Sequence, residues 1–262
     1  MIRRTGGGDC REGTTPRRVL IVALKHIGDV IVATPALLAL KEFWPQAELE
    51  LLVGRGMGEL VRELPQVTKL QEIDRAAQRG RPLAELALVR SLRARCYDVA
   101  IDLTGGERSA WYVFLSGAPM RVGVADRNGF PGRRLLFQHT TPWGAGHYAQ
   151  NMRDILVPLG IVGQAGPLKI AIPARAKAAA ERMLTGIDRP RAVIHPVSRW
   201  MFKSWPIATC AATIRTLIDD GVQVILSSGP AAVELDHNHA IMDALPEAYT
   251  KKIRDFSGKT TL

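Results

Sequence analysis

The sequence predicts an α/β protein in which a parallel sheet is covered by helices on both faces. Short aliphatic runs bounded by Gly, Pro or Asp alternate with longer segments whose apolar residues recur every three or four positions. Strands that alternate with helices pair through crossover connections, which makes the sheet parallel. A Gly- and Pro-rich break over 160–173 interrupts this alternation, which then resumes. The break therefore predicts two α/β domains.

Each predicted element rests on length and pattern. Five short aliphatic runs are predicted as strands: 19–24, 48–53, 97–103, 191–195 and 222–226. Six segments with helical spacing are predicted as helices: 30–44, 82–94, 147–159, 174–185, 205–220 and 230–244. Pro35 lies inside the first helical segment, where it removes a backbone donor and predicts a kink or a late start. Ser204 is predicted as the N-cap of the fifth helix, with Pro206 in its first turn.

The domain boundaries follow from these elements. We predict a flexible leader over 1–18, an N-terminal domain over 19–162, a linker over 163–173 and a C-terminal domain over 174–262. The leader is basic and Gly-rich but has no apolar core of the kind that a secretory signal requires. The C-terminal domain contains only two or three strand patterns, so we expect it to be incomplete.

Composition and charge exclude several classes of protein. With 47% hydrophobic and 23% charged residues, the chain of 262 residues can form a folded core. No apolar run approaches the roughly 20 residues that cross a bilayer. The net charge of +10 is spread along the chain, so we do not expect nucleic acid as the partner; phosphorylated and anionic-membrane partners fit equally well. Three widely spaced cysteines predict neither a disulfide framework nor a zinc ribbon, and a reducing cytosol is expected.

The first candidate site follows the first predicted strand, where Gly28 and Asp29 precede a helical segment. A carboxylate at the end of a strand is well placed to take a proton from a substrate hydroxyl. An Asp at a helix N-cap also stabilises the helix without any catalysis. Lys25 and the helix N-terminus favour the ionised form in either case. The residues alone leave both interpretations open.

The second candidate site is the segment from His195 to Pro206, which leads from a strand into a helix. It carries the hydroxyl of Ser198 and the cations of Arg199 and Lys203. Together with a helix N-terminus, these groups predict a cradle for a diphosphate, because amides, helix dipole and cations all favour negative charge. The alternative is an ordinary loop with solvated cations.

The third candidate site is the turn Ser227-Ser228-Gly229-Pro230, followed by Glu234 one turn into the next helix. A Gly turn lets a ligand approach the backbone, and Glu234 could accept hydrogen bonds from ribose hydroxyls. An exposed Glu near a helix N-terminus is also favourable without any ligand. The Gly-rich turn of a dinucleotide-binding protein is missing after the first strand, which argues against an oxidoreductase, and no metal site is predicted.

Several segments together resemble glycosyltransferase family 9, the ADP-heptose:lipopolysaccharide heptosyltransferases. The segment from Lys25 through Asp29 to Pro35 looks like the N-terminal signature of that family. Four further segments resemble it in order and approximate spacing: Arg121-Val-Gly123, His147–Asn151 with Leu159-Gly160, His195–Pro206, and Ser228-Gly229-Pro230 with Glu234. The last two segments are most similar to the subgroup that adds the third, branching heptose of the inner core. The resemblance covers roughly residues 17–262.

The resemblance implies a GT-B fold, with two Rossmann-like domains around a cleft, and inverting, metal-independent chemistry. Asp29 resembles the general base that deprotonates the acceptor hydroxyl. Lys203 and Ser198 resemble the groups that hold the diphosphate and stabilise the departing ADP, beside Arg199. Glu234, next to Ser228 and Gly229, resembles the contact to the ribose. Arg121, Arg55 and Arg62 resemble the basic surface with which family members contact the phosphorylated acceptor. Arg55 and Arg62 lie in the loop and helix predicted after the second strand.

The resemblance also implies partners and a location. The donor is ADP-heptose, no cofactor is needed, and the acceptor is the inner core of lipopolysaccharide. We therefore expect a cytoplasmic protein with peripheral contact to the cytoplasmic face of the inner membrane.

Members of the family normally continue with a further strand and an Asp-Ser/Thr-Gly…His segment that completes the donor pocket. Because this sequence lacks that segment, we expect a C-terminally truncated chain with exposed sheet edges. The alternative function is a non-catalytic remnant that binds a nucleotide or an anionic glycan.

Overall fold

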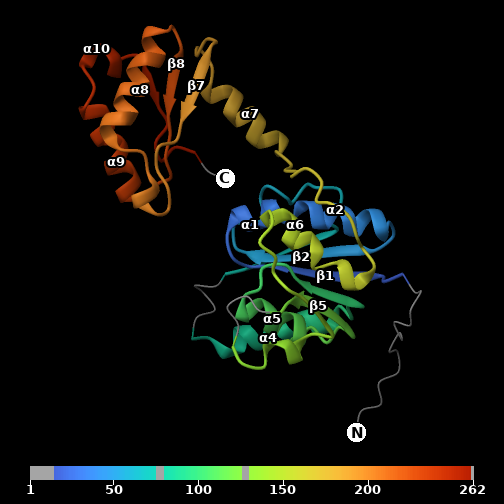
Figure 1. Ribbon diagram of the computed structural model, residues 1–262. Coiled ribbons are helices and arrows are strands. Elements are labelled where there is room, and N and C mark those ends of the chain that lie inside the picture. The colour runs from blue at the N-terminus through green and yellow to red at the C-terminus, as the bar shows by residue number, and fades with distance from the viewer. Residues whose placement is uncertain (1–14, 75–79, 126–129, 261–262) are drawn as a thin grey trace. The chain divides into compact units, whose positions relative to one another are not determined.

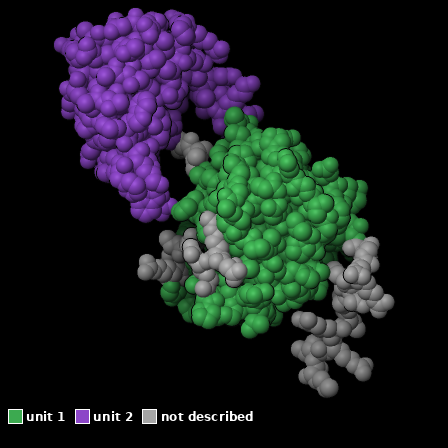
Figure 2. Space-filling view, in the orientation of Figure 1, with its two compact units in different colours: residues 1–173 green, residues 174–262 purple. Residues whose placement is uncertain are grey.

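The computed structural model describes residues 15–74, 80–125 and 130–260. The chain forms two compact units, one over residues 1–173 and the other over residues 174–262 (Figure 2). Each unit has its own sheet and its own core, and each is described by itself. Both are α/β, as the alternating pattern predicts.

Unit 1 contains a six-stranded sheet with the order β3-β2-β1-β4-β5-β6, and every neighbouring pair is parallel. Its strands are β1 (Arg18–Ala23), β2 (Glu48–Gly54), β3 (Lys69–Ile73), β4 (Val99–Asp102), β5 (Met120–Val124) and β6 (His139–Thr141). Strand β1 lies in the middle, with Ile21 opposite Leu51 of β2 and Ile101 of β4. Because the strands are parallel, the loops after them gather at one edge of the sheet.

Helices cover both faces of this sheet (Figure 1). One face packs against α1 (Ile27–Val32), α2 (Thr34–Phe43) and α6 (Tyr148–Asp154), and the other against α4 (Pro82–Ala94) and α5 (Glu107–Leu115). Two short 3₁₀ helices, η1 (Arg133–Leu136) and η2 (Val157–Leu159), complete the unit. Alternate residues of β1 enter the two cores, with Ile21 on one side and Leu20 on the other. This alternation explains why β1 is a continuous aliphatic run.

Unit 2 contains a three-stranded parallel sheet with the order β7-β8-β9. Its strands are β7 (Arg191–Ile194), β8 (Gln223–Leu226) and β9 (Ile253–Asp255). Its helices are α7 (Ala174–Met183), α8 (Ile207–Asp219), α9 (Ala232–Asp243) and α10 (Glu247–Thr250), with the 3₁₀ helix η3 at Met201–Lys203. The core forms between the sheet and the apolar sides of α8 and α9, where Ile214, Val224 and Ile241 are fully buried.

Most predicted elements are confirmed, and the differences have local causes. The predicted helix 30–44 is wrong in its start, because α1 begins at Ile27. The break predicted at Pro35 is confirmed: α1 ends at Val32, and α2 starts at Thr34 with Pro35 in its first turn. The predicted helix 147–159 ends at Asp154 and continues only as η2. The predicted helix around Arg62 is absent, because residues 55–67 form turns.

The sequence pattern did not reveal four strands, β3, β5, β6 and β9, and two helices, α5 and α10 (Glu247–Thr250). These strands have three to five residues, and β3 reads Lys-Leu-Gln-Glu-Ile, with only Ile73 buried. Short strands at the side of a sheet carry too few buried residues to give an aliphatic run. Their place in the sheet comes from pairing with β2, β4, β5 and β8 instead.

The predicted leader and linker lie partly within unit 1. Residues 1–14 of the leader are outside the described residues, and β1 already starts at Arg18, where the backbone amides of Arg17 and Arg18 donate to Asp98 at 2.7 and 3.0 Å. In the 163–173 segment, the backbone of Lys169 donates to Thr34 Oγ1 at 3.0 Å, and that of Ala171 to Leu60 at 2.8 Å. The segment therefore follows the surface of unit 1 up to Pro173.

Among the described residues, no helix combines the length and apolar character that crossing a membrane requires.

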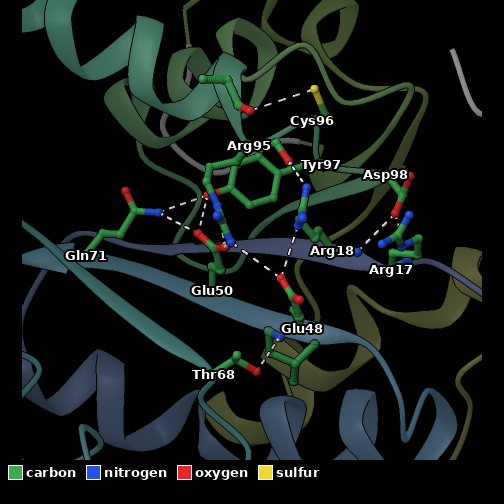
Figure 3. Close-up of polar contacts among 12 residues, drawn as sticks. Arg17, Arg18, Glu48, Glu50, Thr68, Gln71, Arg95, Cys96, Tyr97 and Asp98 are labelled. Atoms are coloured by element: carbon green, nitrogen blue, oxygen red, sulfur yellow. Dashed lines mark hydrogen bonds and ion pairs between the residues drawn. The ribbon is translucent and has the colours of Figure 1, made fainter. Parts of the chain in front are cut away.

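A buried polar cluster joins β2, β3 and the start of β4 at the end of the sheet opposite the strand-following loops (Figure 3). Glu50 is fully buried, and its carboxylate accepts hydrogen bonds from Tyr97, Gln71 and Arg95. The bonds from Tyr97 and Arg95 lower the pKa of Glu50 against the opposing effect of burial. Burial and the Glu50 charge raise the pKa of Tyr97. The cluster fixes the register of the first strands and lies away from the candidate site.

Candidate functional site

Asp29 lies in the loop and helix that follow β1. It is the third residue of α1, and its Oδ2 accepts a hydrogen bond from the backbone N–H of His26 at 2.9 Å. The prediction of an N-cap Asp is therefore wrong, because His26 is the N-cap and Asp29 closes the first turn from the N3 position. The side chain is half-buried and neighbours Gly28, where an added Cβ would meet nothing within 4 Å. Asp29 is therefore partly accessible to solvent.

The loop after β4 lies beside the loop that carries Asp29. Asp102 ends β4, is fully buried, and accepts the backbone N–H groups of Thr104 and Gly105, both at 3.0 Å. Its other oxygen binds the buried guanidinium of Arg133 at 2.6 Å. Burial raises the pKa of Asp102, while Arg133 and these amides oppose the rise.

The two loops approach each other at Gly106, where an added Cβ would lie 3.9 Å from Lys25 Cε. Sequence reasoning missed the pair of Asp102 and Arg133. An Asp at the end of a strand, followed by Leu-Thr-Gly-Gly, is the local signal that could have pointed to it.

Arg55 and Arg62, predicted to meet an acceptor, follow β2 at the same edge of the sheet. Both are engaged with carboxylates. The Nη1 of Arg55 lies 2.6 Å from Asp74, and the Nη2 of Arg62 lies 3.3 Å from Glu59 and 3.2 Å from Glu72. An incoming anion would therefore have to exchange with these acids.

Arg121 is placed differently from the other predicted residues. It is the second residue of β5, so it lies toward the start of the strand, away from the edge that carries Asp29. Its guanidinium donates to the carbonyls of Leu136 at 2.8 Å and Ala118 at 2.7 Å, and it lies over the ring of Phe114. Burial lowers its pKa. These contacts give Arg121 a structural role in the turn before β6.

In unit 2, the loops after β7 and β8 are joined directly. His195 Nδ1 lies 3.0 Å from the Oγ of Ser227, which links the first residue after each strand. His237 of α9 then contacts the backbone carbonyl of Trp205 at 2.9 Å through Nε2. These bonds place the His195–Pro206 loop next to the Ser227–Pro230 turn.

The first of these loops folds onto itself. The backbone N–H of Ser198 donates to the Oγ of Ser204 at 3.0 Å, and that of Trp205 to the Pro196 carbonyl at 2.8 Å. The prediction that Ser204 caps the following helix is therefore wrong: Pro206 is the N-cap of α8, and Ser204 closes the loop instead.

The two predicted cations of this loop are exposed. Lys203 lies at the end of η3, with its Nζ 5.6 Å from the ring centre of Phe202. Arg199 lies over Trp200, 6.0 Å from its ring. An open hollow of about 410 Å³ along β7 is lined in part by Lys203, His195 and Trp205. The loop therefore presents positive charge beside a concave surface.

The turn after β8 is held by Glu234. Its Oε2 accepts the backbone N–H of Gly229 at 2.7 Å, and a Cβ added at Gly229 would lie 2.7 Å from the same oxygen. A side chain at position 229 would therefore require the Glu234 carboxylate to shift. Ser228 is buried, and its hydroxyl donates to the Gly229 carbonyl at 3.0 Å. Glu234 thus shapes the turn before any ligand arrives.

Two residues that sequence reasoning missed hold the ends of β8 and β9 together. The side-chain amide of the buried Asn238 donates to the Ser227 carbonyl at 3.1 Å and to Ser257 Oγ at 2.8 Å. The backbone N–H of Gly258 donates to the Ser228 carbonyl at 3.0 Å. An Asn within a helix gives no sequence signal for such a contact.

Comparisons with known proteins show the family of the chain. The family model "Glycosyltransferase family 9 (heptosyltransferase)" matches residues 85–262, which is more than half of the chain. The chain belongs to glycosyltransferase family 9. A curated relative, lipopolysaccharide heptosyltransferase 3 of Escherichia coli K12, is 28% identical over 247 residues, which cover 90% of this chain and 70% of the relative.

Solved structures of similar fold include two further glycosyltransferases. A family 9 member from Veillonella parvula has a TM-score of 0.80 at 20% identity, covering 94% of this chain and 70% of its own. The E. coli heptosyltransferase WaaC, solved with ADP-2-deoxy-2-fluoro heptose, has a TM-score of 0.70 at 21% identity, covering 91% and 75%. These likenesses confirm the GT-B class of two Rossmann-like domains, the second of them partial.

Within this family 9 glycosyltransferase, the structure brings the predicted residues together in each unit separately. Unit 2 gathers its predicted residues in two joined loops at one sheet edge: Ser198, Arg199, Lys203, Ser228, Gly229 and Glu234. Unit 1 carries Asp29, Arg55 and Arg62 at the edge formed by the ends of β1 and β2, whereas Arg121 lies elsewhere.

Proposed function

We propose that this glycosyltransferase moves a heptosyl group from ADP-heptose to the inner core of lipopolysaccharide with inversion at the anomeric carbon and without a metal. The observation that carries the proposal is the joined pair of loops in unit 2. They place the Lys203 and Arg199 cations and the Ser198 hydroxyl beside a glycine turn at one sheet edge. The names of the relatives, heptosyltransferases and a WaaC structure with an ADP-heptose analogue, support the choice of donor and acceptor.

Asp29 is the proposed general base. Its carboxylate takes the proton of an acceptor hydroxyl while that oxygen forms a bond to the anomeric carbon of the donor. The bond from that carbon to the diphosphate oxygen breaks on the opposite side, and ADP leaves with the electron pair. The hydrogen bond from the backbone N–H of His26 holds one carboxylate oxygen in place.

The leaving diphosphate gains negative charge as its bond to the sugar breaks. Lys203 and Arg199 compensate this charge, and the Ser198 hydroxyl donates a hydrogen bond, so that the loop stabilises the transition state more than the bound donor. Glu234 lies next to the Gly229 turn and is proposed to accept from the ribose hydroxyls. Arg55 and Arg62 are proposed to contact the phosphorylated acceptor by exchanging their acidic partners.

The proposed acceptor is lipid-linked, so we also propose peripheral contact with the cytoplasmic face of the inner membrane. Arg121 is not included among the acceptor contacts, because its guanidinium already donates to two backbone carbonyls.

Donor binding is tested by calorimetric titration with ADP, UDP and NAD. We expect selective ADP binding that Lys203→Ala weakens at least tenfold, because the variant removes an exposed cation from the diphosphate cradle. Lys177→Ala, an exposed lysine of α7, is the matched control and should bind as the unmodified chain does. Equal affinity for ADP and UDP, or an unchanged affinity of Lys203→Ala, would contradict the assignment.

The general base is tested by Asp29→Asn with truncated lipopolysaccharide as acceptor. Asn keeps an oxygen that can accept from His26, so the helix start is preserved. We expect turnover to fall by about 10²–10⁴-fold while ADP affinity stays within a factor of about three. Near-normal turnover by Asp29→Asn would rule out the base assignment.

A further inference from the structure

We propose that a second surface of unit 1, formed by α4, α5 and η1, binds an anionic phospholipid bilayer. This docking face comprises six apolar residues: Leu83, Leu86, Trp111, Phe114, Phe130 and Leu135. The inference deepens the proposed function, because a lipid-linked acceptor requires the enzyme to work at a membrane surface.

Five of the six residues of the docking face are large apolar side chains that are exposed, whereas Phe130 is partly buried against the core on this side of the sheet. Leu83 is 79% exposed and Leu135 82%, while Trp111 is 43% exposed. Leu83 and Leu86 share one side of α4, and Trp111 and Phe114 share one side of α5, whereas Leu92 and Val113 on the opposite sides are fully buried. Exposed apolar groups gathered in this way mark an interaction surface.

Aromatic contacts hold this face in a fixed arrangement. Trp111 and Phe130 stack with their ring centres 5.6 Å apart and their planes 3° apart, and Phe114 meets Trp111 edge-on at 6.1 Å. The guanidinium of Arg121 covers the other part of Phe114 at 5.3 Å. Tryptophan is the residue that favours the boundary between lipid headgroups and acyl chains, because its ring is amphipathic.

The charge around the docking face complements anionic lipid. Described residues 80–125 and 130–138 contain eight arginines, no lysine and four carboxylates. Three of these carboxylates, Glu85, Asp98 and Asp102, are bonded within the protein, to Arg108, to the backbone of β1 and to Arg133. The exposed Arg81, Arg90 and Arg134 therefore leave a positive surface beside the apolar groups. Anionic headgroups attract such a surface.

The position of the docking face fits delivery of an acceptor to Asp29. Helices α4 and α5 and the 3₁₀ helix η1 follow β3, β4 and β5 in the chain, so their first turns lie toward the edge that carries Asp29. Leu83 is the second residue of α4, and Leu135 is the third residue of η1. At the start of α5, Gly106 lies next to Lys25 of the Asp29 loop. A bilayer on this face would hold its lipid-linked acceptor near that edge.

A second copy of the chain fits this face less well than a bilayer does. A symmetric dimer places the same patch of both copies together. Two arginine-rich surfaces with few acidic residues would then repel each other. Lipid phosphates provide the missing negative charge.

The test is co-sedimentation of the full chain with vesicles of phosphatidylcholine alone or mixed with phosphatidylglycerol. We expect binding to the anionic vesicles and at least tenfold weaker binding to the neutral ones. The double variant Trp111→Ser with Leu135→Ser should lose at least tenfold in affinity for anionic vesicles. Phe43→Ser with Val162→Ser removes exposed apolar groups at 50% and 69% exposure elsewhere in unit 1, and it should bind as the unmodified chain does.

The double variant Arg81→Gln with Arg134→Gln tests the arginines of the docking face. The control is Lys177→Gln with Arg182→Gln on α7, which removes the same amount of charge. Only the first pair should weaken vesicle binding. The proposal is overturned if the two arginine and lysine double variants lose the same affinity for vesicles, or if the chain binds neutral and anionic vesicles alike. It is also overturned if Trp111→Ser with Leu135→Ser instead converts a lipid-free dimer into a monomer in sedimentation velocity. ADP titration of the same variants keeps this outcome separate from the proposed function. If Trp111→Ser with Leu135→Ser keeps both its vesicle binding and its ADP binding, the docking face alone is refuted.

Discussion

Strands β1 and β7 are each the first strand of a unit, and each leads into a candidate-site loop, yet their surroundings differ. Strand β1 has a parallel neighbour on both sides and helices on both faces, and Val19 through Ala23 are fully buried. Among the described residues, strand β7 pairs with β8 alone, and its Val193 is 65% exposed. Similar aliphatic runs therefore contribute differently to stability, because burial depends on the neighbours that the topology supplies.

Buried and exposed ion pairs provide the largest expected difference between the units. Asp102→Ala leaves Arg133 charged and buried without its partner, and should lower the free energy of unfolding of unit 1 by about 3–5 kcal/mol. The pair of Lys251 and Glu247 in unit 2 is 72% and 80% exposed, so Glu247→Ala should cost less than about 0.5 kcal/mol. Hydrogen exchange resolved by mass spectrometry reports each unit separately. Equal losses in the two variants would show that the Asp102 pair is not a structural element of unit 1.

Shortening one side chain in each of the two strands tests the comparison directly. Ile21→Ala removes a fully buried side chain from the middle of the six-stranded sheet and should cost about 2–5 kcal/mol in unit 1. Val193→Ala removes a mostly exposed side chain and should change the stability of unit 2 by less than about 0.5 kcal/mol. Urea unfolding measures both values. A large effect at Val193 would mean that β7 is covered in solution.

The acid sensitivity of unit 1 gives a smaller effect. The pKa of Glu50 is lowered in the folded chain, so its ionised form stabilises unit 1 above the unfolded pKa of about 4.3, and this contribution is lost as the pH falls through the folded pKa. Glu50→Gln should therefore destabilise unit 1 by about 1–3 kcal/mol at pH 7 and by less as the pH falls below 4. Unfolding curves at pH 7, 5 and 3 check this. A difference that grows toward low pH would have the wrong sign.

The sequence predicted the elements that bury continuous aliphatic runs and missed those whose position depends on distant partners. The bounds of α4 coincide with the predicted 82–94, and β1, β2, β7 and β8 agree to within a residue at most ends. Strand β3 has a polar pattern because much of it is half-exposed, so only its pairing with β2 identifies it.

In the candidate site, too, features with a local sequence pattern could be predicted and contacts with distant residues could not. The loops that hold Asp29, Lys203 and Glu234 could be predicted from their place after strands. Contacts between residues far apart in sequence could not, because no local pattern encodes them: Asp102 with Arg133 is 31 residues apart, and His195 with Ser227 is 32. The prediction that Ser204 caps α8 was wrong for a related reason. The Ser204 hydroxyl accepts a hydrogen bond from the backbone of Ser198 within the loop and does not cap the helix that follows.

The pairing of Arg55 with Asp74, and of Arg62 with Glu59 and Glu72, changes how this edge of unit 1 would respond to an anion. Unpaired arginines carry loosely held solution ions, and their affinity for a polyanion falls steeply as salt is added. Here the counterions are carboxylates fixed to the chain itself. A ligand anion must displace these carboxylates, which remain attached to the chain. The edge therefore favours ligands with a higher charge density than a carboxylate. Its selectivity among anions also depends less on ionic strength.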